Sequence, residues 1–136
     1  MNKDLRTIRV VAAIIEKDDR IMIARRSHGE HEGLWEFPGG KYEENETGEE
    51  ALKREIREEF DADIRIKEYL CTIEHDYPSF RLVMDCFVCE LLTDTLELHD
   101  HTAVRFIDPG EENIKWVPAD RKVIKAYKIY SKSATI

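Results

Sequence analysis

The sequence has little of what marks membrane, secreted or nucleic-acid-binding proteins. No apolar run approaches the roughly 20 residues of a membrane-spanning helix, and the N-terminal MNKDLRTIRV lacks the apolar segment of a signal peptide. Three cysteines are too few, and odd in number, for a disulfide scaffold. Lys and Arg number 21 against 29 Asp and Glu, a net charge of −8 that argues against binding nucleic acid polymers or membranes. We therefore expect a cytoplasmic protein with reduced thiols.

The length of the chain, 136 residues, favours one domain spanning residues 1–136. Val- and Ile-rich or alternating segments predict strands at residues 7–16, 20–26, 63–77, 80–91 and 103–107. The first two flank Asp18 and Asp19, which is typical of a hairpin, and the next two are joined around Pro78. Pro118 suits the first turn of a helix, which we expect to end near residue 131. Together with a second helix, these elements predict an α/β sandwich.

Two of the cysteines raise the question of a zinc site. Cys86 and Cys89 have CxxC spacing, and His99 and His101 follow in the sequence. The cysteines fall in the predicted strand 80–91, where positions three apart face opposite sides. We therefore interpret them as ordinary strand cysteines, with structural zinc as the minor alternative.

The most informative segment is GKYEENETGEEALKREIREEFDA, residues 40–62. Thr47 and Glu50 form a Ser/Thr-x-x-Glu capping box, which predicts a helix from about residue 48 to residue 60. At about 100° per residue, the apolar side chains of this helix form a single stripe. The stripe contains Leu52, Ile56 and Phe60. One side of the helix is thus expected to anchor it to a core.

A neighbouring face of the same helix carries Glu55, Glu58 and Glu59. Like charges at these spacings destabilise an isolated helix by roughly a few tenths of a kcal/mol per pair. A hard divalent cation would offset the repulsion, and magnesium fits because it also bridges substrate phosphates. Arg54 is placed to reach back to Glu46 in the preceding loop. The alternative, a solvated acidic face, is disfavoured by the glycine turn, the apolar stripe and the arginine.

These residues resemble the box of the Nudix hydrolases, which reads Gly-x5-Glu-x7-Arg-Glu-apolar-x-Glu-Glu-x-Gly-apolar. The positions that match are Gly40, Glu46, Arg54, Glu55, Ile56, Glu58, Glu59 and Ala62. Asp61 stands where the family has glycine, just past the helix. A left-handed conformation there favours glycine and tolerates Asp at modest cost. The resemblance implies the Nudix fold, a mixed β-sheet sandwiched between helices.

The resemblance also implies magnesium as the cofactor, with Mn²⁺ as an alternative ion. The implied metal ligands are Gly40 through its carbonyl, Glu55, Glu58, Glu59 and Asp100. The implied catalytic residues are Glu46, Arg54, Glu55 and Glu58. Either Glu55 or a carboxylate from a later loop would deprotonate the attacking water, while Arg54 and Glu46 would orient their neighbours. The alternative for Asp100 is an ordinary solvent-facing loop aspartate.

Residues 33–41, GLWEFPGGK, are similar to the segment that leads into the box in MutT-like nucleoside triphosphate pyrophosphohydrolases. By this resemblance the substrate-binding residues are Arg25, Trp35, Phe37, Gly39, Lys41, Arg81 and Asp120. Arg26 is interpreted as a surface charge. In MutT-like enzymes the residue at the start of the terminal helix reads the base. Asp120, an acceptor when ionised, would favour an exocyclic amine such as that of cytosine, or would only stabilise the helix N-terminus.

The expected activity is hydrolysis of a cytidine-type or modified nucleoside triphosphate to a monophosphate and pyrophosphate, as nucleotide-pool house-cleaning. One alternative is a Nudix enzyme for 8-oxo-dGTP, ADP-ribose or a dinucleoside polyphosphate. Another is a non-catalytic nucleotide sensor, which has no chemical need for three mutually repelling glutamates. The expected partner is thus a small nucleotide, and both a monomer and a homodimer remain open.

Overall fold

The computed structural model describes residues 5–134, which form a mixed sheet between two helices. The strands are β1 (Arg6–Lys17), β2 (Arg20–Arg26), β3 (Trp35–Glu36), β4 (Gly39–Lys41), β5 (Ile64–Tyr77), β6 (Phe80–Leu91) and β7 (His101–Ile107). The helices are α1 (Gly48–Phe60) and α2 (Pro118–Ala134). All of the long strands and both helices predicted from the sequence are confirmed within a few residues. Neither of these helices is long and apolar enough to cross a membrane.

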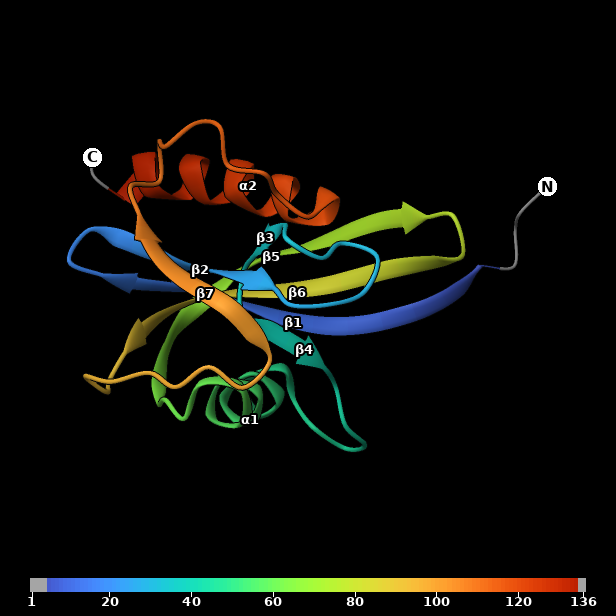
Figure 1. Cartoon of the computed structure of the whole chain (residues 1–136), viewed down its shortest axis with the longest axis horizontal. Helices are drawn as coiled ribbons and strands as arrows, with labels where there is room; N and C mark the ends of the chain where they lie inside the picture. Colours follow the sequence, from blue (N-terminus) through green and yellow to red (C-terminus); the bar gives the residue numbers. More distant parts are fainter. Residues whose placement is uncertain (1–4, 135–136) are drawn as a thin grey trace.

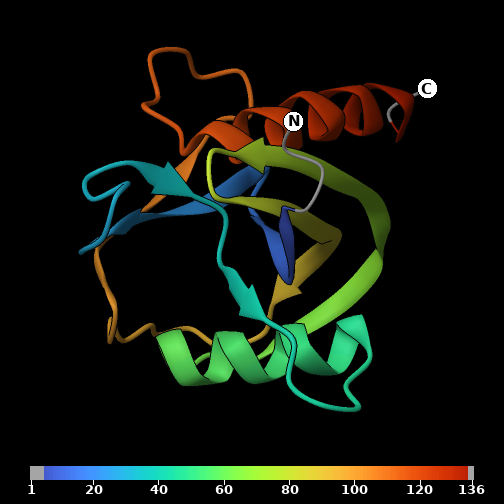
Figure 2. The ribbon, with the colours of Figure 1, turned by 90° about the vertical axis from the view of Figure 1, so that its right-hand side faces the viewer.

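The sheet is built around β1, which pairs antiparallel with β2 and parallel with β6. The strand order is β3-β2-β1-β6-β5, with β4 paired to β1 and β7 paired to β2. Figures 1 and 2 show α2 on one side of the sheet and α1 on the other. The predicted sandwich of helix, mixed sheet and helix is therefore confirmed.

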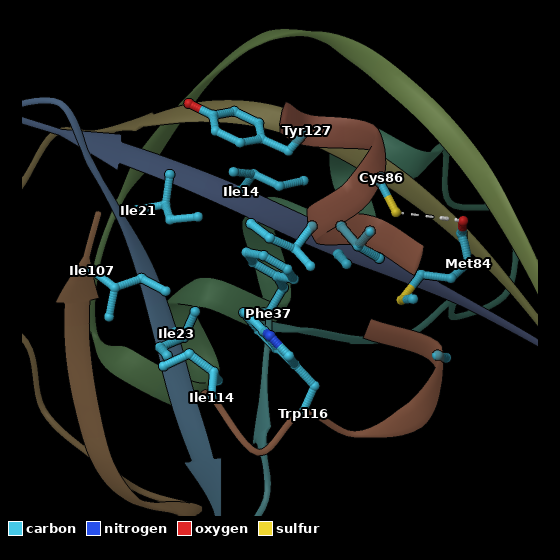
Figure 3. Close-up of a cluster of buried hydrophobic side chains, with 14 of the residues drawn as sticks. Ile14, Ile21, Ile23, Phe37, Met84, Cys86, Ile107, Ile114, Trp116 and Tyr127 are labelled. Carbon is cyan, nitrogen blue, oxygen red and sulfur yellow. Dashed lines mark hydrogen bonds between the residues drawn. The ribbon is translucent and has the colours of Figure 1, made fainter. Parts of the chain in front are cut away.

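Because both faces of the sheet are covered, the central strands are apolar on both sides and divide the core into two clusters. Ile14 of β1 faces α2, where it packs in one cluster with Ile23 and Tyr127 (Figure 3). Ile15 faces α1 and packs in the other cluster with Leu52. The alternation follows from the two-residue period of a strand.

The cysteines of β6 obey the same alternation. Cys86 lies in the cluster beneath α2, whereas Cys89 lies in the cluster above α1. The two thiols therefore point away from each other through the sheet, as predicted, and cannot share a zinc ion. Within residues 5–134, no group of three or more His, Cys, Asp or Glu is arranged to hold a metal ion.

Helix α1 begins and ends as its sequence predicts. The Thr47 hydroxyl accepts from the Glu50 N–H at 3.2 Å, and the Glu50 carboxylate accepts from the Thr47 N–H at 2.9 Å, which completes the capping box. Asp61 ends the helix with φ +52° and ψ +37°, the left-handed conformation expected at the position of the family glycine. The stripe formed by Leu52, Ile56 and Phe60 is fully buried.

Strands β3 and β4 are not predicted by the sequence. They contain two and three residues, too few to display a two-residue period, and β4 includes two glycines, which are poor strand formers. Gly39 explains why β4 can nevertheless pair with β1, since a Cβ at this position would lie 1.9 Å from the carbonyl oxygen of Val11. This close approach places the start of the Nudix-like box on the edge of the central strand.

Candidate active site

Arg54 is the centre of the polar contacts around α1. Its Nε and Nη2 atoms donate to the two carboxylate oxygens of Glu46 at 2.6 and 3.0 Å, a bidentate pair that lowers the pKa of Glu46. Its Nη1 atom donates to Glu55 and to Glu58, both at 3.1 Å, and Nη2 also reaches the carbonyl of Lys41 at 2.9 Å. The arginine thus joins the loop before α1 to two of the predicted ligands, and the expected reach from Arg54 to Glu46 is confirmed.

Gly40 leaves the space in which the Glu55 carboxylate lies. A Cβ on Gly40 would lie 2.3 to 2.6 Å from the three carboxylate atoms of Glu55, closer than any real contact. The missing side chain therefore allows Glu55 to rest directly against the backbone of β4. Burial raises the pKa of Glu55, and the hydrogen bond and charge of Arg54 offset only part of this effect.

Asp100 approaches the same helix from the loop before β7. The two residues line the same cavity, and the pKa of Glu59 is raised by burial first and by the charge of Asp100 next. Ser27 of the opposite loop donates to the Asp100 carbonyl at 2.7 Å. His28 lies 3.6 Å from the Asp100 carboxylate. These contacts bring Asp100 to the acidic face of α1.

The loop that carries Asp100 is attached to the end of α1. The N–H of Glu97 donates to the carbonyl of Phe60 at 2.9 Å, and the N–H of His99 donates to that of Glu59 at 3.3 Å. The side chain of His99 also lies 2.9 Å from the Asp61 carboxylate. The aspartate that replaces the family glycine therefore has a partner in the loop, which no pattern in the sequence indicated.

The acidic residues line a cavity of about 310 Å³ that contains Gly40, Glu55, Glu59 and Asp100. Glu58 lies outside this lining, with its side chain 56% exposed and bound to Arg54. Carboxylate and carbonyl oxygens are the ligands that hard divalent cations take. Two of these carboxylates have raised pKa values, so a cation between them would relieve both burial and repulsion. The chemistry of these oxygen donors therefore fits a divalent metal ion, although within residues 5–134 the side chains are not gathered closely enough to form a ready-made metal site.

A second cavity, of about 320 Å³, adjoins the acidic one and has a different character. The walls of this base-side cavity are largely apolar and aromatic, and both Phe37 and Tyr77 contribute to it. The two cavities share Arg26, Glu36, Gly39, Gly40 and Lys41. A larger cavity of about 850 Å³ is lined by other segments of the chain and contains none of the predicted site residues.

Asp120 lies in the wall of the base-side cavity at the start of α2. Its Oδ2 atom accepts from the N–H of Phe37 at 2.8 Å, and the Phe37 ring stacks on Trp116. Burial, followed by the charge of Glu36, raises the pKa of Asp120 well above its ordinary value. Asp120 therefore contacts the segment between β3 and β4 instead of merely decorating a helix end. Gly39 and Lys41 line the same cavity as expected.

The structure places two neighbouring arginines at the end of β2 differently from what the sequence suggested. Arg25 donates to Thr102 at 2.8 Å and lies over the ring of Trp35, outside both cavities. Arg26, interpreted from the sequence as a surface charge, instead lines both cavities and pairs with Glu36 at 3.1 Å. The pairing of β2 with β7 shifts register between the two arginines, so simple alternation does not decide which one faces the site.

Two further predicted substrate residues also lie elsewhere. Trp35 packs against the core beneath α2 and carries Arg25 and Arg105 on its ring. Arg81 forms an ion pair with Asp76 at 2.7 Å on the exposed side of β6. Neither residue lines the two cavities, so the structure does not bring them to the candidate site.

Glu36 and His101 line the acidic cavity, although the sequence assigned neither of them to this site and raised His101 only in the zinc alternative. Glu36 accepts from Arg26 through one oxygen and lies 2.9 Å from His101 Nε2 through the other. The His101 side chain is only 7% exposed and stacks on Phe60 of α1. Glu36 thereby links β2, β3 and β7 at the boundary between the cavities. Its place within GLWEFPGGK was the only available signal.

Fold and site together define a Nudix hydrolase. The NUDIX domain model matches residues 10–126, and the chain belongs to this family. Hydrolases of the family generally use divalent metal ions, which agrees with the carboxylates presented by α1.

Particular relatives support the same assignment. The CTP pyrophosphohydrolase of Escherichia coli strain K12 is 34% identical over 126 residues, which cover 90% of this chain and 93% of the relative. The 8-oxo-dGTP diphosphatase of Proteus vulgaris is 39% identical over 87 residues, covering 62% and 78%. The solution structure of the E. coli ORF135 protein has a TM-score of 0.82 at 31% identity, covering 95% of this chain and 94% of that chain.

Proposed function

We propose that this protein hydrolyses a nucleoside triphosphate to a nucleoside monophosphate and pyrophosphate, with Mg²⁺ as its metal ion and cytidine-type nucleotides as its preferred substrates. The observation that carries the proposal is the pair of adjoining cavities, one acidic and one largely apolar. The acidic cavity suits metal-bound phosphates, and the apolar cavity suits a base. The likeness to a CTP pyrophosphohydrolase over nearly the whole chain supports the substrate class.

In the acidic cavity, which would hold the phosphates, the carboxylates would bind the metal ion and accept a proton from the attacking water. Bound Mg²⁺, or Mn²⁺ in its place, would lower the pKa of a water and neutralise charge on the phosphates. Its ligands would be the Gly40 carbonyl, Glu55, Glu58, Glu59 and Asp100. Glu55 is also our candidate to accept the water's proton, since burial raises its pKa. Arg54, held by Glu46, would keep Glu55 and Glu58 oriented.

At the base end, Asp120 would select the edge of cytosine that carries an amine. One carboxylate oxygen of Asp120 already accepts from Phe37, which fixes the group in the cavity wall. An ionised carboxylate accepts from the 4-amino group. A protonated one, which its raised pKa favours, also donates to the neighbouring ring nitrogen. Uracil presents a keto oxygen and an N–H there, so it offers the opposite pattern.

The test is a hydrolysis panel with Mg²⁺, covering canonical, methylated and oxidised nucleoside triphosphates, ADP-ribose and a dinucleoside polyphosphate, with both products identified. We expect monophosphate plus pyrophosphate and at least a roughly tenfold preference for CTP over UTP, which corresponds to about 1.4 kcal/mol. Hydrolysis of ADP-ribose in preference to all triphosphates would overturn the substrate class. Nucleotide binding without turnover would indicate a sensor.

Two variants test the metal site and the base preference separately. Glu58→Gln removes a charge and little volume, so we expect turnover to be lost while the fold remains intact. Asp120→Asn should shift relative kcat/KM from cytidine towards oxidised guanine nucleotides. Arg81→Ala, outside both cavities, is the matched control and should leave the preference unchanged. Unaltered preference in Asp120→Asn would remove Asp120 from base recognition.

A further inference from the structure

Two of the three cysteines are cross-strand neighbours. Cys71 of β5 lies directly opposite Cys86 of β6 in the antiparallel register. Residues opposed in this way have Cα atoms about 4.5 to 5.5 Å apart, inside the range of about 4.4 to 6.8 Å that a disulfide spans. Both side chains lie on the α2 side of the sheet, Cys86 within the buried cluster and Cys71 packed against it. A covalent bond between them therefore needs little movement of the backbone.

The two thiols differ in a way that assigns each a chemical role. Cys71 is partly exposed, and its interaction with the Cys86 thiol lowers its pKa, so Cys71 is the thiol that solvent oxidants reach. Cys86 is completely buried, and its pKa is raised by its interaction with Cys71 and by burial. Cys86 is thus shielded from direct attack but adjacent to whatever forms on Cys71.

Cys89 provides an internal contrast. It is equally buried but faces α1 on the other side of the sheet, where burial raises its pKa to about 12. The residue opposite it on β5 is Ile66, so it has no thiol to pair with across the strands. Cys86 and Cys89 are therefore equally buried, and only Cys86 is positioned opposite another thiol with which it can form a disulfide.

From this geometry we propose that Cys71 and Cys86 form a reversible dithiol–disulfide pair, with a peroxide as oxidant. The Cys71 thiolate attacks one peroxide oxygen, the O–O bond breaks, and the departing hydroxide takes up a proton to leave as water. The Cys86 sulfur then attacks the resulting sulfenic acid, and its proton leaves with the hydroxyl group as a second water. Two electrons pass from the two thiols to the peroxide. A small thiol reductant reverses the bond by exchange.

The bond would lie beneath the base-side cavity. The Cys86 Sγ atom now contacts the carbonyl of Met84 at 3.7 Å, as Figure 3 shows, and Met84 lines that cavity. Oxidation replaces this contact and links the irregular part of β5, where the register shifts between Tyr69 and Cys71, to β6 two residues from Met84. Oxidation of this pair could therefore change the position of Met84, which lines the substrate cavity.

The experiment treats the reduced, full-length protein with hydrogen peroxide and follows its intact mass and its free thiols. We expect a loss of about 2 Da, a fall from three free thiols to one, a peptide linking Cys71 to Cys86, and full reversal by dithiothreitol. Cys89→Ala is the matched control and should still lose about 2 Da. Cys71→Ser should not.

Three outcomes would overturn the proposal. One is oxygen addition to Cys71 without a cross-link. Another is a disulfide between two chains, visible as a dimer on a non-reducing gel and dependent on protein concentration. Retention of all three thiols under conditions that oxidise a free cysteine peptide would equally reject it. Peptide mapping of Cys86→Ala provides a second check, because that variant should accumulate the Cys71 sulfenic acid, which a dimedone probe traps.

Discussion

Replacing Gly40 by alanine tests the contact on which the acidic site depends. A Cβ at this position would lie about 2.4 Å from the Glu55 carboxylate, whereas ordinary van der Waals contact begins near 3.4 Å. Because the clashing atoms are the end of a flexible side chain, Glu55 would move by about 1 Å and the fold would persist. The backbone of Gly40 does not need the left-handed region, so alanine is conformationally acceptable.

The magnitude follows from this displacement. A misplacement of about 1 Å in a reacting group costs roughly 100-fold in rate, so we expect kcat/KM for the triphosphate to fall by about that factor. The free energy of unfolding should change far less than the activation free energy. Losing the Glu55 contact with Arg54 costs about 1 to 2 kcal/mol, and the stiffer unfolded chain returns about 0.4 to 1 kcal/mol. A domain of this size would then lose no more than about 7 °C in Tm.

The assay combines steady-state kinetics at saturating Mg²⁺, a Mn²⁺ titration followed by electron paramagnetic resonance, and a thermal scan. Gly110→Ala, in a loop outside both cavities, should leave all three unchanged. Gly39→Ala should fail to fold, since its Cβ would meet backbone at 1.9 Å. Gly40→Ala with kcat/KM within about threefold of the wild type, where the 1 Å argument requires about 100-fold, would refute the reasoning.

Two further predictions concern Arg54 at the candidate site and Asp85, a buried carboxylate of β6. Arg54→Lys cannot keep the bidentate pair with Glu46, so we expect kcat to fall about 10- to 100-fold with a weaker Mn²⁺ affinity, measured by the same titration. Burial opposes ionisation of Asp85, but hydrogen bonds from Tyr42 and its other partners outweigh it and lower the Asp85 pKa. This stabilisation is present above the unfolded pKa, near 4, and is lost as the pH falls through the folded pKa. Asp85→Asn should therefore lower Tm at pH 7 through a loss of about 1 to 3 kcal/mol, and the difference from wild type should shrink below about pH 4. A Tm difference between Asp85→Asn and wild type that stays constant from pH 7 to below about pH 4 would contradict this prediction.

The parts of the fold that the sequence predicted are those in which local signals agree. Both ends of α1 are specified by short-range chemistry, the capping box at Thr47 and the left-handed Asp61, and its buried stripe has helical period. The long strands β1, β5 and β6 carry enough residues to display their pattern. The short β4 does not, because its pairing depends on the absence of a side chain at Gly39, seen only against Val11.

The site shows the same division. The box residues around Arg54 were predictable because their spacing on one helix fixes their relative positions. Arg25 and Arg26 were not, because they are neighbours at the end of β2, where the pairing with β7 shifts register, and only tertiary structure shows that Arg26 lines the cavities. The contact between His99 and Asp61 was equally hidden, since it joins two segments 38 residues apart. Site residues that are brought together only by tertiary contacts cannot be predicted from a local sequence pattern.

The parallel pairing of β1 with β6 also dictates how this chain can fold. Arg6 lies beside Phe80, and the register continues to Glu16 beside Glu90, so the two central strands are 74 residues apart in sequence. Closing so long a loop costs entropy before any contact is gained, which makes such pairings slow. During synthesis, one side of β1 must stay open until β6 has left the ribosome. The pairing of β1, whose residues 11–15 are fully buried in the finished protein, is therefore among the last to be completed. Its exposed Val- and Ile-rich side needs protection from aggregation until then.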